Sequence, residues 1–168
     1  FMPGDMPLPE IPRFGMYLIA REDISKISWF GRGPHENYSD RKSSAAIGIY
    51  NSTVAEQYHP YVRPQETGNK TDVRWASFVN NDEKGILIKG EKPLNVSAWH
   101  FTQEDIDYVP FDIKRKHGGS IEKRDLIWIN IDNDQMGVGG DNTWGAHVHP
   151  EYTITPDPMS YSFTISPK

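Results

Sequence analysis

The 168-residue sequence contains no cysteine, which excludes disulfides, thiolate metal sites and cysteine nucleophiles. No apolar run approaches the roughly 18–20 residues that a membrane-spanning helix needs. Basic residues are in the minority, since 18 Lys and Arg against 23 Asp and Glu give a formal net charge of −5. Without a basic patch to neutralise phosphates, a protein binds nucleic acid poorly. We therefore expect neither nucleic acid nor a membrane as a partner.

Apolar and aromatic side chains are abundant enough to build a core. Hydrophobic residues make up 36% of the chain and aromatic residues 12%, including five Trp and eight Tyr. This length suits one domain. The opening stretch FMPGDMPLPEIPRF holds four prolines and starts with Phe1. We expect residues 1–11 to be a proline-rich linker or the cut end of a longer protein, and residues 12–168 to form the domain.

Alternating apolar and polar residues predict an all-β fold, an antiparallel β-sandwich, punctuated by 14 Gly and 13 Pro. The turn composition of Asn81–Gly85 predicts a hairpin between the strands on either side. Pro156–Pro158 predicts a last hairpin in the same way. The predicted strands are 13–21, 26–31, 71–81, 85–90, 94–101, 124–132, 151–156 and 159–166.

Helix is predicted at one place with a defined start. Thr102 and Asp105 have the spacing of a capping box, with Thr102 as the N-cap and Asp105 at the third helical position. The helix is expected over 103–109, because Pro110 follows. A further helical turn is expected within 39–48.

The stretch WFGRGPHENYSDRKSSA (29–45) crowds charged residues around a Gly-Pro turn. One interpretation makes Glu36 or Asp40 an acid/base residue, with His35 beside it. The favoured interpretation is a surface loop held by charge pairs such as Glu36 with Arg41.

The stretch YHPYVRPQETGNKTDVRW (58–75) is expected to be a stiff loop that enters a strand. Planar amide, carboxylate and guanidinium groups are suited to hydrogen-bonding a sugar. The candidates in this stretch are Gln65, Glu66, Asn69 and Arg74. We favour the alternative, in which these side chains satisfy the backbone of their own loop.

The stretch MGVGGDNTWGAHVHPEY (136–152) contains two histidines two residues apart. His147 and His149 would share a face of a strand, and with Asp141 they suggest a zinc site. Asp141 is only nearby in the sequence, a third protein ligand besides the two histidines is not evident and no cysteine is present, so a metal is the less favoured interpretation.

Trp144 lies between Asn142-Thr143 and Gly145, where a turn does not need an indole. An exposed indole is a good platform for the apolar face of a pyranose ring, and the neighbouring glycines let the backbone approach a ligand closely. The alternative is that Trp144 covers the end of the sandwich.

These three stretches, in this order, resemble the C-terminal domain of the large β-galactosidases of glycoside hydrolase family 2. That domain is also called domain 5 or the small-chain domain. The resemblance runs from about Pro12 to about Lys168 and rests on three separate motifs. It implies an antiparallel β-supersandwich similar to the galactose mutarotase fold, of which this chain is the later part.

The resemblance also implies a role for the tryptophan loop. In the family, a tryptophan on this loop forms part of the galactoside platform, and Trp144 is the matching position. Asp141 and Asn142 are taken with it as substrate-binding residues. The motif reads Asp-Asn-Thr-Trp where Asp-Asp-Ser-Trp is usual, so Asn142 and Thr143 depart from the pattern.

The family's two catalytic carboxylates belong to its barrel domain, so the resemblance implies no catalytic residue, cofactor or metal in this chain. Mg²⁺ and Na⁺ are expected elsewhere in the intact enzyme, which is expected to be a homo-oligomer. The expected partners are a galactoside substrate, the barrel and other domains of the same polypeptide. Two alternatives are an autonomous carbohydrate-binding module that uses Trp144, Trp75 or Trp99, and a mutarotase-like enzyme. A cytoplasmic or a periplasmic location fits equally well.

Overall fold

The computed structural model describes residues 1–63, 65–107, 119, 121–142 and 144–168. Within these residues the chain forms seven strands and three short helical segments. The strands are β1 (Arg13–Ala20), β2 (Lys26–Gly33), β3 (Ala46–Thr53), β4 (Lys70–Val79), β5 (Gly85–Trp99), β6 (Ile127–Gln135) and β7 (Phe163–Pro167). The helical segments are η1 (Val54–Gln57), α1 (Gln103–Ile106) and η3 (Pro150–Tyr152). The predicted all-β fold is confirmed.

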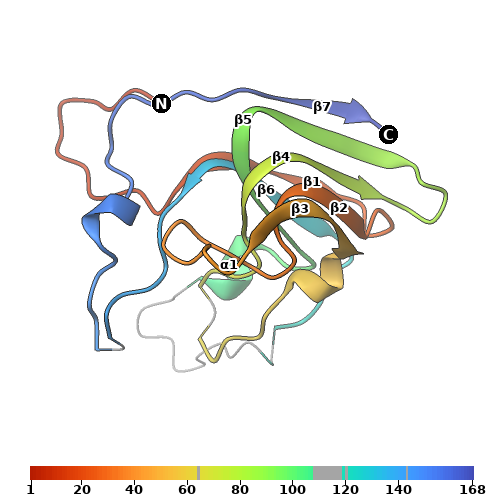
Figure 1. The fold of residues 1–168 in the computed structure, drawn as a ribbon, viewed down its shortest axis with the longest axis horizontal. Helices are drawn as coiled ribbons and strands as arrows, with labels where there is room; N and C mark the ends of the chain where they lie inside the picture. Colours follow the sequence, from red (N-terminus) through yellow and green to blue (C-terminus); the bar gives the residue numbers. More distant parts are fainter. Residues whose placement is uncertain (64, 108–118, 120, 143) are drawn as a thin grey trace.

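All the described strands belong to one antiparallel sheet (Figure 1). Its order is β1-β6-β5-β4-β2-β3, and β7 pairs with β5 outside this path. The hairpin predicted around Asn81–Gly85 is confirmed, since Val79 of β4 pairs with Gly85 of β5. Other pairings are long-range, as where Arg13 of β1 lies opposite Gln135 of β6.

The long strand β5 changes neighbours midway along its length. Ile86–Gly90 pairs with β7, whereas Asn95–Trp99 pairs with β6. Strand β4 lies along the other edge of both halves. The two strands predicted at 85–90 and 94–101 are therefore one continuous strand. This exchange of neighbours within a single open sheet is consistent with the predicted β-sandwich.

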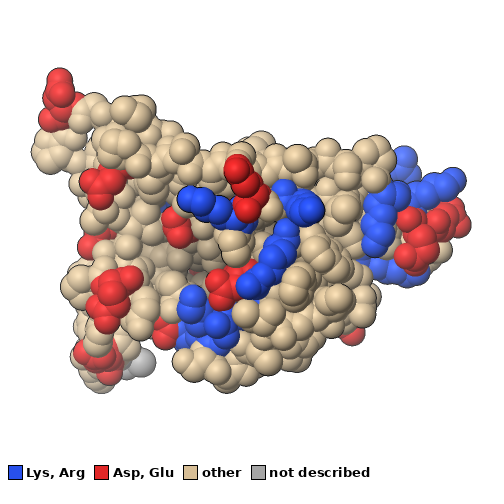
Figure 2. Space-filling model, turned by 45° about the horizontal axis from the view of Figure 1, so that its top comes forward, with Lys and Arg blue, Asp and Glu red and all other residues tan. Residues whose placement is uncertain are grey.

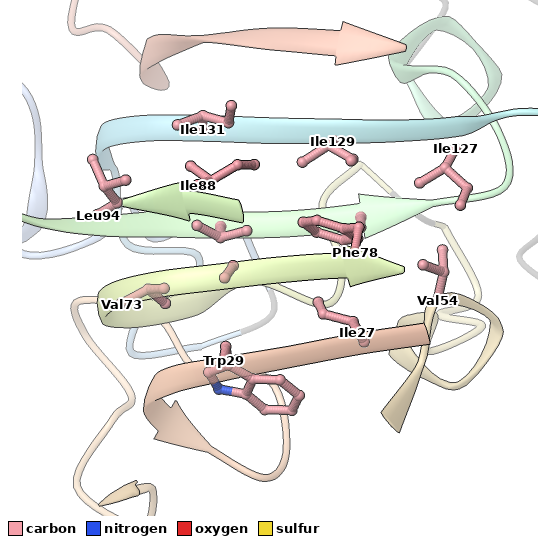
Figure 3. Close-up of a cluster of buried hydrophobic side chains, with 13 residues drawn as sticks. Ile27, Trp29, Val54, Val73, Phe78, Ile88, Leu94, Ile127, Ile129 and Ile131 are labelled. Atoms are coloured by element: carbon pink, nitrogen blue, oxygen red, sulfur yellow. The ribbon is translucent and has the colours of Figure 1, made fainter. Parts of the chain in front are cut away.

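One face of the sheet carries the main apolar core (Figure 3). Alternate residues of each strand reach it, as the period of two requires. On β6 these residues are Ile127, Ile129 and Ile131, all fully buried. Each such side chain contributes roughly 1.5–3 kcal/mol through burial. Strands β2, β4 and β5 supply most of the remaining cluster.

The opposite face of β6 is buried as well. Trp128 packs there in a second cluster with Trp99, Phe101 and Ile106 of α1. The indole N–H of Trp128 donates to Asn130 Oδ1 at 2.9 Å, so this cluster satisfies its own polar group. Side chains of β6 are therefore buried on both faces of the sheet.

Helix α1 starts as predicted but is shorter than expected. The Asp105 carboxylate accepts from the backbone N of Thr102 at 2.8 Å and from its hydroxyl at 3.1 Å, which confirms the capping box. The helix spans Gln103–Ile106, and Asp107 is already extended with ψ of 145°. Residues 108 and 109 of the predicted helix lie outside the described part of the chain.

Two predicted elements are wrong. The segment 39–48 was expected to contain a helical turn, but residues 46–53 form strand β3, which pairs with β2. The expected hairpin of 151–156 with 159–166 is absent from the described residues. The first of these segments holds only the end of η3, and the second leads into β7, which pairs with β5. Backbone pairing with a distant strand outweighs the local turn signal here.

The two ends of the sheet path expose apolar side chains. Ile19 of β1 is 57% exposed and Ile49 of β3 is 64% exposed. Neither strand has a partner along its outer edge within the described residues. Long unpaired edges of this kind are usually covered in an assembled protein.

Along the left of the face drawn in Figure 2 only Asp and Glu side chains are seen, whereas Lys and Arg lie among Asp and Glu in its middle and on its right. Blue and red atoms lie side by side there, without a large basic field. None of the helices in the described part of the chain is long and apolar enough to cross a membrane.

Candidate functional site

The predicted substrate-binding residues lie on the loop between β6 and η3. This loop, residues 136–149, extends away from the sheet on the left of Figure 1. Trp144 is 92% exposed, which is the highest value among the described large hydrophobic residues. The alternative in which Trp144 covers the end of the sandwich is therefore wrong for this chain, because the indole has almost no protein around it.

The backbone around Trp144 is shaped by its neighbours on either side. The Asn142 side-chain oxygen accepts the backbone N–H of Trp144 at 2.8 Å. Gly145 follows with φ of +101°, a conformation that favours glycine, and a Cβ there would meet nothing within 4 Å. Glycine is thus needed at 145 for its backbone angle, and Asn142 fixes the backbone at Trp144.

Asp141 closes the loop by pairing with a residue on the returning arm. Its carboxylate lies 2.9 Å from Nε2 of His149. This hydrogen bond and the charges of Asp141 and Glu151 raise the pKa of His149. Asp141 and His149, two of the three residues weighed as zinc ligands, thus form a loop contact, and no group of three potential ligands occurs in the described part of the chain.

The start of the loop contacts a segment almost a hundred residues earlier. Oδ2 of Asp40 accepts the backbone N–H of Val138 at 3.0 Å and that of Gly139 at 2.7 Å. On the other side, the N–H of Gly137 donates to the carbonyl of Tyr152 at 2.8 Å. Sequence reasoning weighed Asp40 only as an acid/base residue and missed this contact.

In the charged stretch 29–45, residues 29–33 belong to β2 and the rest acts as a structural loop. Arg41 pairs with Oε1 of Glu36 at 2.9 Å, which confirms the predicted charge pair. The other carboxylate oxygen of Glu36 accepts the N–H of Gly68 at 2.8 Å, and Tyr61 donates to Glu36 as well. Glu36 therefore joins this loop to the stretch 58–75, and its oxygens are already occupied.

The sugar-binding candidates of the stretch 58–75 are mostly engaged internally. Asn69 is fully buried and donates to the carbonyl of Asn37 at 2.9 Å. Arg74 donates to the carbonyl of Asp72. Glu66 accepts from Arg13 and from the N–H of Thr67. The favoured interpretation, in which these side chains satisfy the backbone of their own loop, is confirmed for Arg74 and Glu66, whereas Asn69 satisfies the backbone of the stretch 29–45 instead.

A buried charge cluster that the sequence did not indicate lies beneath this stretch. Arg13 of β1 contacts Glu66, and its Nε lies 3.2 Å from Asp132 of β6. Burial raises the pKa of each carboxyl to about 7, against the lowering effect of Arg13. Neither carboxylate oxygen of Asp132 has a hydrogen-bond partner among the described residues. This cluster ties β1, β6 and the loop together.

A hollow of about 1020 Å³ opens beside the cluster, and Trp144 does not line it. Its apolar wall is Tyr17 stacked on Trp128, with ring centroids 3.7 Å apart and an angle of 14° between the planes. Polar groups on its lining include Glu66, Gln103 and Gln135. The chain thus has two adjoining candidate surfaces, the tryptophan loop and this hollow, because Met136, Gly137 and Val138 at the start of the loop also line the hollow.

One aromatic candidate is excluded by its position. Trp99 was weighed as part of a sugar-binding face, but it is fully buried and stacked on Phe101. Its indole N–H donates to the carbonyl of Thr67 at 2.9 Å. It is a core residue, because alternation along β5 points it into the second cluster.

Comparisons with known proteins agree on one family over almost the whole chain. The family model described as "Beta galactosidase small chain" matches residues 2–165. The chain is 41% identical over 163 residues to a β-galactosidase of Priestia megaterium and 36% identical over 161 residues to one of Vibrio cholerae. These alignments cover 95% and 96% of the chain but only 15% and 14% of those proteins. The chain thus spans about a seventh of the length of its curated relatives.

Proposed function

This chain belongs to the β-galactosidase small-chain family, and from that premise we propose that it is a non-catalytic domain of a β-galactosidase. In this proposal the intact enzyme hydrolyses terminal β-D-galactosides, and the loop 136–149 completes its substrate cleft. The observation that carries the proposal is the 92% exposure of Trp144 on a loop that is fastened at its base. The turn does not need an indole for its own folding, and binding residues are often carried on loops held by a rigid scaffold, so the exposed ring supports a binding role.

The indole would act as a stacking surface for the galactose ring. By analogy with aromatic pairs and exposed cation–π contacts, one such contact contributes about 1–2 kcal/mol. A loop that is already ordered loses little further entropy when the sugar binds. Asn142 and Asp141 support this role by fixing the backbone on both sides of the indole.

The catalytic chemistry is assigned to other parts of the polypeptide. Retaining glycosidases use two carboxylates about 5 Å apart, one as nucleophile and one as acid/base. Asp132 is fully buried, and Glu36 and Glu66 are engaged with their neighbours, so none of them is proposed as a catalyst. We also assign the Mg²⁺ and Na⁺ sites to the rest of the enzyme. The exposed edges β1 and β3 are the surfaces proposed to meet it.

Replacing Trp144 by alanine in the full-length enzyme tests this proposal. The KM for lactose is expected to rise about tenfold, because about 1.4 kcal/mol of stacking is lost, and kcat should change less. Trp144→Phe keeps an aromatic face and should restore most of the affinity. Steady-state kinetics of the three enzymes measures both constants.

The matched control is Trp75→Phe, which changes a half-buried indole on β4. It should leave the KM for lactose unchanged. If Trp144→Ala leaves both KM and kcat unchanged, the loop has no part in the cleft and the proposal is wrong.

A second candidate function is an autonomous carbohydrate-binding module. The observation that favours it is the hollow, in which the Tyr17–Trp128 stack lies beside carboxylate and amide groups. Sites of this size with a few convergent polar groups often bind small molecules. The two functions differ in whether the isolated chain binds a galactoside without the rest of the enzyme.

A further inference from the structure

The tryptophan loop is held at its base by backbone hydrogen bonds from Met136 and Gly137 and by one carboxylate, that of Asp40. Oδ2 of Asp40 accepts two consecutive backbone N–H groups, at 3.0 Å from Val138 and 2.7 Å from Gly139. Hydrogen bonds to an ionised acceptor are roughly twice as strong as neutral ones, and successive N–H groups form a concavity that suits an anion. This is the contact that joins the loop to the segment between β2 and β3.

The glycines of the GVGG motif make this contact possible. A Cβ on Gly137 would lie 2.8 Å from Cγ of Asp40, and one on Gly139 would lie 3.3 Å from Oδ2. A Cβ on Gly140 would lie 2.1 Å from the carbonyl oxygen of Ala146, where the two arms of the loop approach each other. Any side chain at 137 or 140 would therefore separate the loop from its supports.

The segment that carries Asp40 is itself held firmly. Tyr38, two residues earlier, is 1% exposed and forms a β-bridge with Arg41. Arg41 in turn pairs with Glu36 at 2.9 Å. Because Asp40 lies on this segment, it holds the start of the loop at a fixed place relative to the rest of the domain.

We infer that Asp40 is a positioning residue that sets where the Trp144 indole stands in the substrate cleft. The inference rests on the proposed function of the loop. Asp40 acts through the backbone of Val138 and Gly139 and does not itself touch the sugar. This role replaces the acid/base interpretation of Asp40, because its Oδ2 accepts from two backbone donors and its Oδ1 is buried, without a hydrogen-bond partner among the described residues.

The test compares Asp40→Ala and Asp40→Asn in the full-length enzyme with Asp82→Ala as the matched control. Asp82 lies in the turn between β4 and β5, at the opposite end of Figure 1 from the loop. Asp40→Ala is expected to raise the KM for lactose about fivefold and Asp40→Asn about twofold, because a neutral amide oxygen accepts more weakly. The value of kcat should change less than KM, and Asp82→Ala should change neither.

Hydrogen exchange gives a readout that is independent of activity. A peptide covering 136–140 should exchange about tenfold faster in Asp40→Ala, because its N–H groups lose their acceptor and the loop opens locally. Peptides from β6 should be unaffected if the fold is intact. In a double variant with Trp144→Ala, the Asp40→Ala change should have no further effect on KM, since the two residues act as one unit.

Each outcome decides a separate point. Unchanged exchange in 136–140 would overturn the inferred contact whatever the role of Trp144. Faster exchange with an unchanged KM would overturn the positioning role, provided that Trp144→Ala does raise KM. If Trp144→Ala has no effect on KM either, the proposed function fails, and the positioning inference fails with it.

Discussion

Replacing Arg13 by methionine is expected to lower the free energy of unfolding of this chain by about 3–5 kcal/mol at pH 8, because it leaves two buried carboxylates without their cation. Arg13 contacts Glu66 and lies 3.2 Å from Asp132, and the side chain of Asp132 is 1% exposed. Methionine keeps most of the aliphatic length, so the loss reports on charge rather than on packing. Urea denaturation of both proteins at pH 8 measures it.

The pH dependence of this effect follows from the two carboxyl groups. Burial raises the folded-state pKa of Glu66 and Asp132 to about 7, above the ordinary value for each. Between the unfolded and folded pKa values the folded chain binds more protons, so their contribution to stability falls as the pH rises through 7. The cost of Arg13→Met should accordingly be smaller at pH 5.5, where both groups are largely protonated.

Asp132→Asn is the companion variant for this prediction. It removes one buried charge, so the free energy of unfolding should fall less between pH 6 and pH 8 than it does in the unsubstituted chain. Combined with Arg13→Met, it should recover part of the lost stability. A cost for Arg13→Met below about 1 kcal/mol at pH 8, in the range of a surface pair, would show that the cluster is not buried in solution.

Replacing Trp99 by alanine is expected to cost about 3–5 kcal/mol of unfolding free energy, the range for a large aromatic residue removed from a core. Trp99 is fully buried, and its ring stacks on Phe101 with centroids 5.4 Å apart. The change also leaves the carbonyl of Thr67 without its donor, at 2.9 Å in the present structure. The denaturation midpoint of the chain measures the effect.

Trp144→Ala is the control for this prediction, because both variants lose an indole. Trp144 is 92% exposed, and surface substitutions are usually within about 0.5 kcal/mol of neutral. The two tryptophans should thus differ by several kcal/mol in stability. Similar losses for both would mean that the exposed loop packs on the rest of the chain in solution.

The strands that the sequence predicted well are those with strong alternation and buried apolar residues. In 124–132 the residues Ile127, Ile129 and Ile131 mark one face, and β6 follows them. Strand β3 was missed because Ile47 and Ile49 are interrupted by Gly48 and followed by polar residues. These are features of an exposed edge strand rather than of a core strand.

The C-terminal pairing shows a different limit of sequence reasoning. Pro156–Pro158 is a genuine turn signal, but the strand that follows pairs with β5, so that Ile165 lies opposite Ile88. A local pattern shows that a segment is extended, not which distant strand it joins. The same limit applies to β1, which pairs with β6 from the other end of the chain.

The candidate site was predicted only in part, because a local sequence pattern does not show which distant residues contact it. Trp144 stands out in the sequence because a glycine-rich turn does not need an indole, and its exposure is consistent with that interpretation. The supports of the loop could not be found in this way. Asp40 accepts hydrogen bonds from Val138 and Gly139, which are almost a hundred residues away in the sequence. Arg13 and Asp132 are similarly remote, and neither lies in a recognisable motif.

The central claim is that the Trp144 indole forms part of a galactoside site completed by the rest of the enzyme. Calorimetric titration with a galactoside inhibitor tests it most directly, using the full-length enzyme, its Trp144→Ala variant and the isolated chain. We predict about tenfold weaker binding by the variant and no measurable binding by the isolated chain. Equal affinity of the enzyme and its variant, with binding retained by the isolated chain, would contradict the account and favour a separate carbohydrate-binding module.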